Sequence, residues 1–329
     1  MNAITLPDIE AAQRRIEGKV EPTATVPSVS LTEIAGAPVF LKLEHRQTTG
    51  SFKLRGASNA VAQLDTSARR RGVVAASTGN HGRALAYAAK LEGVRAVICM
   101  SRLVPDNKIT EIRRLGADIR IVGDSQDDAQ DEADRLVETD GLTMVPPFDN
   151  ADVIAGQGTV GIEMMEAVPT AGTMLVQLSG GGLAAGVAAA VKGLSPSTRV
   201  IGVSMQRGAA MKASLDAGRP VPVEEVPTLA DSLGGGIGLS NRFTFGMCRN
   251  LLDGVVLLTE AEIAAGISHA YAVEREIVEG AGAVGIAAIL AGKVKLEVET
   301  IVLLSGRNID MDLHRRIVNG DWVEGRGMA

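Results

Sequence analysis

The sequence is poor in cysteine, in aromatic residues and in positive charge. Of its 329 residues only two are cysteines, Cys99 and Cys248, and 2% are aromatic. Two cysteines exclude a disulfide-rich secreted scaffold, and neither has a partner at metal-ligand spacing, so we expect buried thiols, a cytoplasmic protein and no metal site. Lys and Arg number 33 against 39 Asp and Glu, a net charge of −6. This balance gives no electrostatic reason to expect nucleic acid or an anionic membrane as a partner.

Long hydrophobic segments are also scarce. The N-terminus has no apolar segment followed by a cleavage site, so we expect no signal peptide. Residues 167–191 carry no charge and are long enough to cross a bilayer, but they contain Pro169, Gln177, Ser179 and five glycines. We interpret this stretch as a strand, a glycine turn and a helix, and we expect no membrane partner.

Glycine is the residue in excess, with 38 copies and no collagen-like period. Such glycines indicate tight strand-to-helix turns or close approach of the backbone to a ligand. Short β-branched runs alternate with helical patterns, which predicts an α/β protein with doubly wound parallel sheets covered on both faces. The predicted strands are Val39–Glu44, Val73–Ser77, Ala96–Met100, Ile119–Val122, Thr173–Leu178, Val200–Ser204, Val255–Leu258 and Ile301–Leu304. The predicted helices include Leu54–Leu64, Arg83–Leu91, Lys108–Leu115, Asp127–Glu138, Leu183–Val191 and Glu260–Ala272.

The strand–helix units at 73–123 form a compact group, and the chain leaves them through its only proline pair, Pro146-Pro147. We therefore predict a smaller domain inserted in a larger one. The larger, cofactor-binding domain comprises residues 1–62 and 149–329, and the smaller, substrate-loop domain comprises residues 63–148.

The segment Ser179-Gly180-Gly181-Gly182-Leu183 joins a buried strand to a helix. Backbone N–H groups that converge at a helix start bind anions, so we predict a phosphate site. No Gly-Lys-Ser/Thr follows, which excludes a nucleoside-triphosphate P-loop. The next strand ends in Ser204-Met205-Gln206 without the acid that binds a dinucleotide ribose. A turn that only permits close helix packing is the alternative.

Lys53 follows Ser51 and Phe52 at a predicted helix start. Ser51 is a candidate N-cap. The positive end of the helix dipole opposes an ammonium in the first turn, which favours a lowered lysine pKa and a reactive amine. The alternative is an ordinary solvated lysine.

Two further strand ends carry polar residues. Ser77-Thr78-Gly79-Asn80-His81 presents hydroxyls, an amide and N–H groups suited to a carboxylate. His81 has no Asp or Ser partner nearby in the sequence, so we expect it to fix the loop rather than to act as a base. Ser305 follows the last strand, at the carboxyl edge of the sheet.

These four segments, in this order, resemble the fold-type II pyridoxal-phosphate enzymes (tryptophan synthase beta-like), and within them the threonine/serine dehydratase branch that also contains serine racemase. The resemblance implies pyridoxal 5'-phosphate as cofactor and Lys53 as its Schiff-base lysine. It implies a substrate site at Ser77, Thr78, Gly79, Asn80 and His81, with Thr78 also catalytic, and cofactor contacts from Phe52, Asn80, Gly180, Gly181, Gly182, Leu183, Glu279 and Ser305.

The resemblance further implies a lyase that removes water from a β-hydroxy amino acid and yields a 2-oxo acid and ammonia, in a homodimer or higher homo-oligomer without a C-terminal regulatory domain. Ser305 is a neutral partner for the pyridine nitrogen, which favours prompt elimination. Four segments are most similar in sequence to the dehydratase-like proteins of hydroxyectoine utilisation. They are STGNHGRA, SGRNID, residues 227–236 and residues 278–283. A hydroxyectoine-derived hydroxy amino acid is therefore the alternative substrate.

Departures from the family narrow the prediction. The stretch Ser204–Ala210 lacks the acids that bind a divalent cation in serine racemase, and Thr78 replaces that enzyme's second-face serine. Amino-acid racemisation is accordingly a weaker alternative. Arg307 stands where glycine is usual, either reaching a substrate acid or lying on the surface. From other classes, a two-domain small-molecule binding protein and a nicotinamide dehydrogenase remain alternatives.

Overall fold

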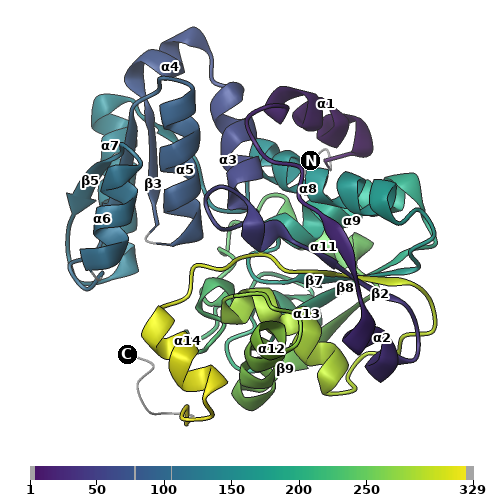
Figure 1. Cartoon of the computed structure of the whole chain (residues 1–329). Helices are drawn as coiled ribbons and strands as arrows, with labels where there is room; N and C mark the ends of the chain where they lie inside the picture. Colours follow the sequence, from purple (N-terminus) through teal and green to yellow (C-terminus); the bar gives the residue numbers. More distant parts are fainter. Residues whose placement is uncertain (1–3, 78, 105, 324–329) are drawn as a thin grey trace.

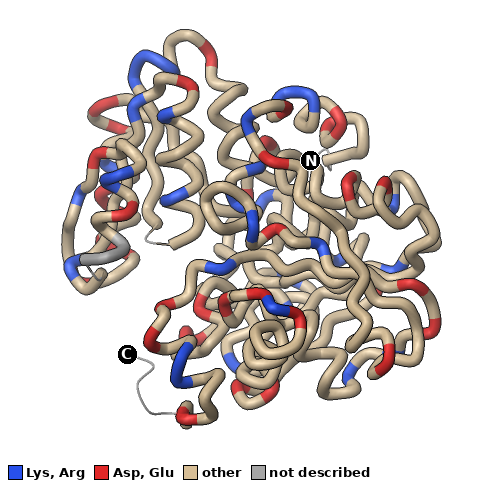
Figure 2. Tube along the Cα trace, in the orientation of Figure 1, with Lys and Arg blue, Asp and Glu red and all other residues tan. Residues whose placement is uncertain are grey.

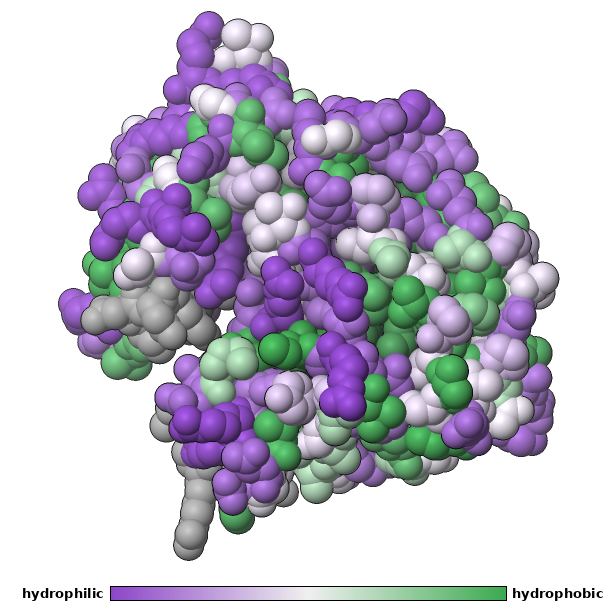
Figure 3. Space-filling view, viewed as in Figure 1, coloured by the Kyte–Doolittle hydropathy of each residue, from purple (hydrophilic) through white to green (hydrophobic). Residues whose placement is uncertain are grey.

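Two sheets organise the chain in this computed structural model, which describes residues 4–77, 79–104 and 106–323. Ten strands fall into a sheet of six and a sheet of four. The smaller sheet and its helices form one lobe, at the upper left of Figure 1, and the larger sheet occupies the rest of the molecule. The outline of the molecule is indented between the two lobes in the space-filling view of Figure 3.

The six-stranded sheet has the order β1-β2-β10-β7-β8-β9. All neighbours are parallel except the edge pair β1 and β2. Because β10, from the end of the chain, lies between β2 and β7, chain segments far apart in sequence end side by side at one edge. The strands are β1 Thr25–Ser28, β2 Val39–Lys42, β7 Thr173–Gln177, β8 Arg199–Met205, β9 Gly254–Leu258 and β10 Thr300–Leu303.

Helices cover both faces of this sheet because its buried strands alternate their side chains between two apolar cores. Met174 and Val176 pack into one core and Leu175, between them, into the other. The first core involves α1 Leu6–Ile16, α8 Ala151–Ala167, α9 Gly182–Leu194, α10 Ala210–Ala217 and α11 Thr244–Leu251. The second involves α2 Val29–Ala35, α12 Glu260–Ala272, α13 Gly280–Leu290 and α14 Met311–Val318.

The four-stranded sheet is parallel, with the order β5-β4-β3-β6. Its strands are β3 Val73–Ala76, β4 Ala96–Met100, β5 Asp118–Ile121 and β6 Thr143–Met144. One face packs on α3 Lys53–Ala62, α5 Asn80–Leu91 and α6 Asp106–Arg114, and the other on α7 Gln126–Asp140; α4 Thr66–Arg71 precedes β3. Since α3 also packs on α8, it connects the two lobes.

The predicted fold class is confirmed, and all eight predicted strands are present within one or two residues of their expected ends. Two strands were missed. Strand β1 contains Pro27 and lies at the sheet edge, where a missing N–H is tolerated. Strand β6 has only two residues, too few for a periodic pattern. The boundaries of the inserted domain stay a prediction.

The surface carries charges of both signs, interspersed along the helices of each lobe in Figure 2. Cys99 and Cys248 are free and buried. Among the helices that the structure describes, none is both long and apolar enough to cross a membrane.

Candidate active site

A cavity lies at the carboxyl ends of β7 and β10, where parallel α/β sheets bind ligands. It combines one amine, one carboxylate, several amide and hydroxyl groups and three glycines. The lining residues are Phe52, Lys53, Asn80, Phe148, Gln177, Ser179, Gly180, Gly181, Gly182, Leu183, Ser232, Leu233, Glu279, Ala281 and Ser305.

Lys53 is the first residue of α3, and its amine reaches the cavity. Its Nζ donates a hydrogen bond of 2.6 Å to the carbonyl of Pro147 and lies 5.3 Å from the centre of the Phe52 ring. Burial lowers the pKa of this amine to about 8, against a smaller opposing effect of Glu279. The lowered pKa agrees with the sequence prediction, but its main cause is loss of hydration.

Ser51 does not cap this helix, so that prediction is wrong. The N-cap is Phe52, without a side-chain hydrogen bond, and the buried Ser51 hydroxyl has no partner among the described residues. Ser51 instead forms a β-bridge with Gly306, and the Phe52 N–H donates to the Ser305 carbonyl at 3.0 Å. These contacts hold the start of α3 against the end of β10.

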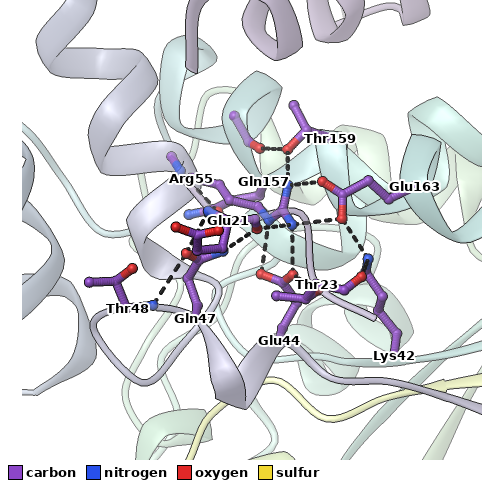
Figure 4. Close-up of polar contacts among 12 residues, drawn as sticks. Glu21, Thr23, Lys42, Glu44, Gln47, Thr48, Arg55, Gln157, Thr159 and Glu163 are labelled. Carbon is purple, nitrogen blue, oxygen red and sulfur yellow. Dashed lines mark hydrogen bonds and ion pairs between the residues drawn. The ribbon is translucent and has the colours of Figure 1, made fainter. Parts of the chain in front are cut away.

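A buried ion cluster lies beneath the same helix (Figure 4). The Arg55 guanidinium, 1% exposed, donates to both oxygens of Glu44, at 2.9 and 2.7 Å, and to both oxygens of Glu163, at 2.6 and 2.8 Å. Lys42 also pairs with Glu163, at 2.5 Å. The cluster joins β2, α3 and α8, so it anchors the helix that carries Lys53.

The three glycines form a cradle at the N-terminus of α9. Gly181, the N-cap, has φ +90°, and a Cβ on Gly180 would lie 2.5 Å from the Phe148 ring. Only glycine fits this path without displacing its neighbours. Within the described part of the chain, no acceptor bonds the N–H groups of Gly181, Gly182 and Leu183. Free N–H groups at the positive end of a helix suit a phosphate.

Ser305 and Gln177 supply polar groups at the two neighbouring strand ends. Ser305 is 2% exposed and lines the cavity directly after β10. Gln177 donates from its side chain to the Leu303 carbonyl at 2.6 Å, while its Oε1 is buried and has no partner among the described residues. The Gln177 carboxamide thus leaves a buried oxygen at the cavity without a protein partner, and a polar ligand would satisfy it.

Of the predicted substrate loop, Asn80 lines the cavity, whereas Ser77 and His81 make local contacts. The Ser77 hydroxyl accepts from the Gly82 N–H at 3.1 Å. His81 Nε2 bonds the Val145 carbonyl at 2.7 Å, and burial, with a smaller effect of the Lys53 charge, lowers its pKa to about 3. A neutral His81 that fixes the loop agrees with the prediction. Thr78 lies outside the described residues, and Gly79 is the N-cap of α5.

Glu279 contacts the cavity from the start of α13. Asn80 Nδ2 donates to its Oε1 at 2.8 Å and the Asn308 N–H to its Oε2 at 3.1 Å. Burial, with a smaller effect of Asp231, raises the pKa of Glu279 to about 7 despite these bonds. Arg307, by contrast, is exposed and does not line the cavity, which places it on the surface.

Three groups at the site were not predicted from the sequence: the side chains of Phe148 and Gln177 and the carbonyl of Pro147. Gln177 had a signal, because a glutamine at the end of an apolar strand has to find a partner. Phe148 had none, since only the return from the small lobe places it against the glycines. Ser232 and Leu233 also line the cavity, and they belong to the 227–236 segment that was singled out for its resemblance to the dehydratase-like proteins.

Comparison with known proteins identifies the family. The sequence model described as "Pyridoxal-phosphate dependent enzyme" matches residues 16–306. The chain belongs to this family. Its predicted cofactor, pyridoxal phosphate, and its fold-type II class are thereby confirmed.

The relatives include dehydratases. A Sinorhizobium fredii protein named "Putative threonine dehydratase" is 64% identical over 97% of both chains. The L-threonine ammonia-lyase of Thermotoga maritima is 43% identical over 98% of this chain and 80% of its own length. The structure of maize serine racemase has a TM-score of 0.91 at 32% identity, covering 97% of this chain and 98% of that one. The predicted class of enzyme, a pyridoxal-phosphate-dependent lyase similar to threonine dehydratase, is confirmed.

Pyridoxal phosphate fits the residues that the cavity provides. The cradle leaves donors for a phosphate at one end, and the Lys53 amine lies within the same cavity. When bound, the cofactor supplies an electron sink that makes the α-hydrogen of an amino acid acidic. The protein supplies the amine, the donors and the dry surroundings.

Gly181→Ala is expected to raise the dissociation constant of pyridoxal phosphate about tenfold or more. Alanine at φ +90° costs about 1–2 kcal/mol, and its Cβ would lie 2.7 Å from Met211, so the donors shift. Equilibrium dialysis measures the effect. Gly218→Ala is the matched control, because φ is +69° and nothing lies within 4 Å of its Cβ; an equal loss of affinity in both variants would contradict the cradle.

The lowered pKa of Lys53 predicts how the apoenzyme captures its cofactor as pH changes. Only the neutral amine reacts, so the rate is expected to rise about tenfold per pH unit below pH 8 and to level off above it. Stopped-flow absorbance with added pyridoxal phosphate measures this rate. A rate that keeps rising beyond about pH 10 would indicate an ordinary lysine.

Proposed function

We propose that this enzyme removes water from a β-hydroxy amino acid of the threonine or serine kind and releases a 2-oxo acid and ammonia. The observation that carries the proposal is the Lys53 amine, with a pKa lowered to about 8, in one cavity with the glycine cradle. The dehydratases and ammonia-lyases among its relatives support the same reaction.

The contacts of the described residues support roles for several of the predicted ones. Gly180, Gly181, Gly182 and Leu183 would hold the phosphate of a bound cofactor, and Ser305 would offer a neutral hydroxyl to its ring nitrogen. Phe52 packs beside Lys53. Asn80, whose amide nitrogen is bonded to Glu279, would contact the ring oxygen of the cofactor, and Glu279 would orient Asn80. The loop of Ser77, Thr78, Gly79, Asn80 and His81 binds the substrate carboxylate.

Lys53 holds and moves the proton in this proposal. Its amine, neutral in part near neutral pH, accepts the α-proton of the substrate. The Pro147 carbonyl, 2.6 Å away, orients the amine meanwhile. His81, neutral and bonded to Val145, takes no part in proton transfer.

The two lobes support the proposed domains, 1–62 with 149–329 and 63–148, because the four-stranded sheet falls wholly within the inserted range. A homodimer or higher homo-oligomer is proposed on the family resemblance alone. Two unpaired buried cysteines support a reducing, cytoplasmic location.

A hydroxyectoine-derived hydroxy amino acid is the second candidate substrate. This candidate is a substrate of the hydroxylated diamino-acid type, so it carries an additional amine, and one observation favours such a substrate. Asp231, exposed on the short helix η2 Asp231–Leu233, lies beside Ser232 and Leu233 at the cavity and contributes to the raised pKa of Glu279. These two acids give the mouth a negative charge suited to a second ammonium group.

A substrate panel tests the proposal and separates the candidates. The holoenzyme is incubated with L-threonine, L-serine, 3-hydroxyaspartate and a hydroxyectoine-derived hydroxy amino acid. The 2-oxo acid, the ammonia and any D-amino acid that form are measured. Equal amounts of the two products from threonine or serine support the first candidate. Turnover of the hydroxyectoine-derived acid alone supports the second, and D-amino acid without oxo acid would show a racemase and refute the lyase.

A further inference from the structure

Four polar side chains form a line of hydrogen bonds between the two lobes. Arg83 Nη1 donates to Asn308 Oδ1 at 3.1 Å, and Asn308 Nδ2 donates to Asn80 Oδ1. Asn80 Nδ2 in turn donates to Glu279 Oε1 at 2.8 Å. The line begins at a cation on α5 and ends at the carboxylate that lines the cavity.

Arg83, the first residue of this line, determines which way each hydrogen bond in it runs from donor to acceptor. A guanidinium has only donors, so the atom of Asn308 that faces Arg83 must be the carboxamide oxygen. The amide nitrogen of Asn308 then points the other way, where it donates to the Thr49 carbonyl at 3.0 Å and to Asn80. Thr49 confirms the same orientation independently, because a carbonyl only accepts.

The orientation of Asn308 decides that of Asn80. With its oxygen engaged by Asn308, Asn80 turns its amide nitrogen toward Glu279 and the cavity. Glu279 receives a second donor, the Asn308 N–H, at 3.1 Å. Reversal of Asn80 would bring its oxygen against the carboxylate, where two acceptors repel.

We propose that Arg83 is a positioning residue that, through Asn308, keeps the Asn80 amide nitrogen directed at Glu279 and the cofactor pocket. A glutamine at this position could present either its oxygen or its nitrogen to Asn308, so it would not impose a direction. Arg83 is partly buried, and its side-chain contact among the described residues is the hydrogen bond to Asn308. The hydrogen bond to Asn308 is therefore the contact through which Arg83 orients the Asn308 carboxamide.

The same line connects the lobes. Asn80 and Arg83 lie in the first turn of α5, after β3 of the small sheet, whereas Asn308 and Glu279 follow β10 and precede α13 in the larger lobe. Asn308 also bonds the loop that leads to Lys53, through Thr49. One carboxamide thus aligns three sides of the pocket.

The first test compares Arg83→Gln with Arg83→Lys. The apparent dissociation constant of pyridoxal phosphate for the apoenzyme is measured by absorbance titration, beside the thermal midpoint Tm. Loss of one directed hydrogen bond is expected to raise the constant about fivefold in Arg83→Gln. Arg83→Lys keeps a cation that only donates and is expected to stay within about twofold of wild type. Arg95→Gln, which breaks an exposed ion pair with Asp118, is the control.

The second test uses Asn308→Asp, which keeps the shape and still accepts from Arg83 but cannot donate to Asn80. It is expected to raise the dissociation constant at least as much as Arg83→Gln. Adding Arg83→Gln to Asn308→Asp is expected to change the constant less than about twofold, because Arg83 acts through Asn308.

Three results would overturn the proposal. These are equal effects of Arg83→Gln and Arg83→Lys, an unchanged constant in Asn308→Asp, or independent, multiplying effects in the double variant. The proposal rests on the proposed cofactor contact of Asn80. If wild type binds pyridoxal phosphate but Arg83→Gln binds equally well, only the role of Arg83 fails; if wild type does not bind it, the cofactor assignment fails as well.

Discussion

Lys53→Ala is expected to lower turnover by at least about 10³-fold while the protein stays folded. The variant removes the amine that is proposed to hold the cofactor and to move the α-proton, and acid–base groups contribute about 10²–10⁴-fold by themselves. Steady-state oxo-acid release measures the loss. Absorbance spectra are expected to show that the variant no longer acquires the yellow colour of the holoenzyme.

The stability of the same variant gives an independent check. A partly buried ammonium at a helix start is unfavourable, and alanine favours helix formation. The Tm of the Lys53→Ala apoprotein is therefore expected to equal or exceed that of the wild-type apoprotein. Lys90→Ala, at an exposed position on α5, is the control and should keep full activity. Turnover within about tenfold of wild type in Lys53→Ala would contradict the assignment.

Arg55→Ala is expected to cause a large loss of stability. It leaves Glu44, 0% exposed, and Glu163 without their shared cation (Figure 4). Removing one partner of a buried ion pair costs about 3–5 kcal/mol, because an uncompensated charge stays buried. Urea denaturation followed by circular dichroism measures the change in the free energy of unfolding.

Two further variants make the result specific. Arg55→Lys keeps the charge but cannot pair with both carboxylates in the same bidentate way, so an intermediate loss is expected. Arg95→Ala removes a cation of similar charge from an exposed pair with Asp118 and is expected to cost less than about 1 kcal/mol. If Arg55→Ala and Arg95→Ala lost the same free energy, the ion cluster would not anchor α3.

Much of the fold followed from the sequence because its strands are buried on both faces and its turns are glycine-rich. Strands such as Thr173–Gln177 and Thr300–Leu303 have polar residues only at their ends and a continuous apolar run between them, which is typical of buried parallel strands. Strand order does not follow from such runs. Nothing local to Thr300–Leu303 says that it lies between β2 and β7, although this placement brings Ser305 to Lys53.

In the candidate site, too, some residues could be predicted from local sequence and others depend on tertiary packing. The glycine cradle and Lys53 lie at a strand end or a helix start, so local patterns offered them as candidates. The role of Ser305 was expected only on the family resemblance. Phe148 and Glu279 reach the cavity through tertiary packing, and Glu279 was expected there only on the family resemblance. The prediction that Ser51 caps the helix failed because Ser51 pairs with Gly306, a contact between residues far apart in the sequence.

Borohydride reduction followed by peptide mapping tests the central claim most directly. The holoenzyme is reduced, digested and analysed by mass spectrometry for the pyridoxyl group. The structure predicts loss of the yellow colour and one modified peptide, with the group on Lys53. A protein that takes up no pyridoxal phosphate, or a modification on another lysine with Lys53 unmodified, would contradict the account.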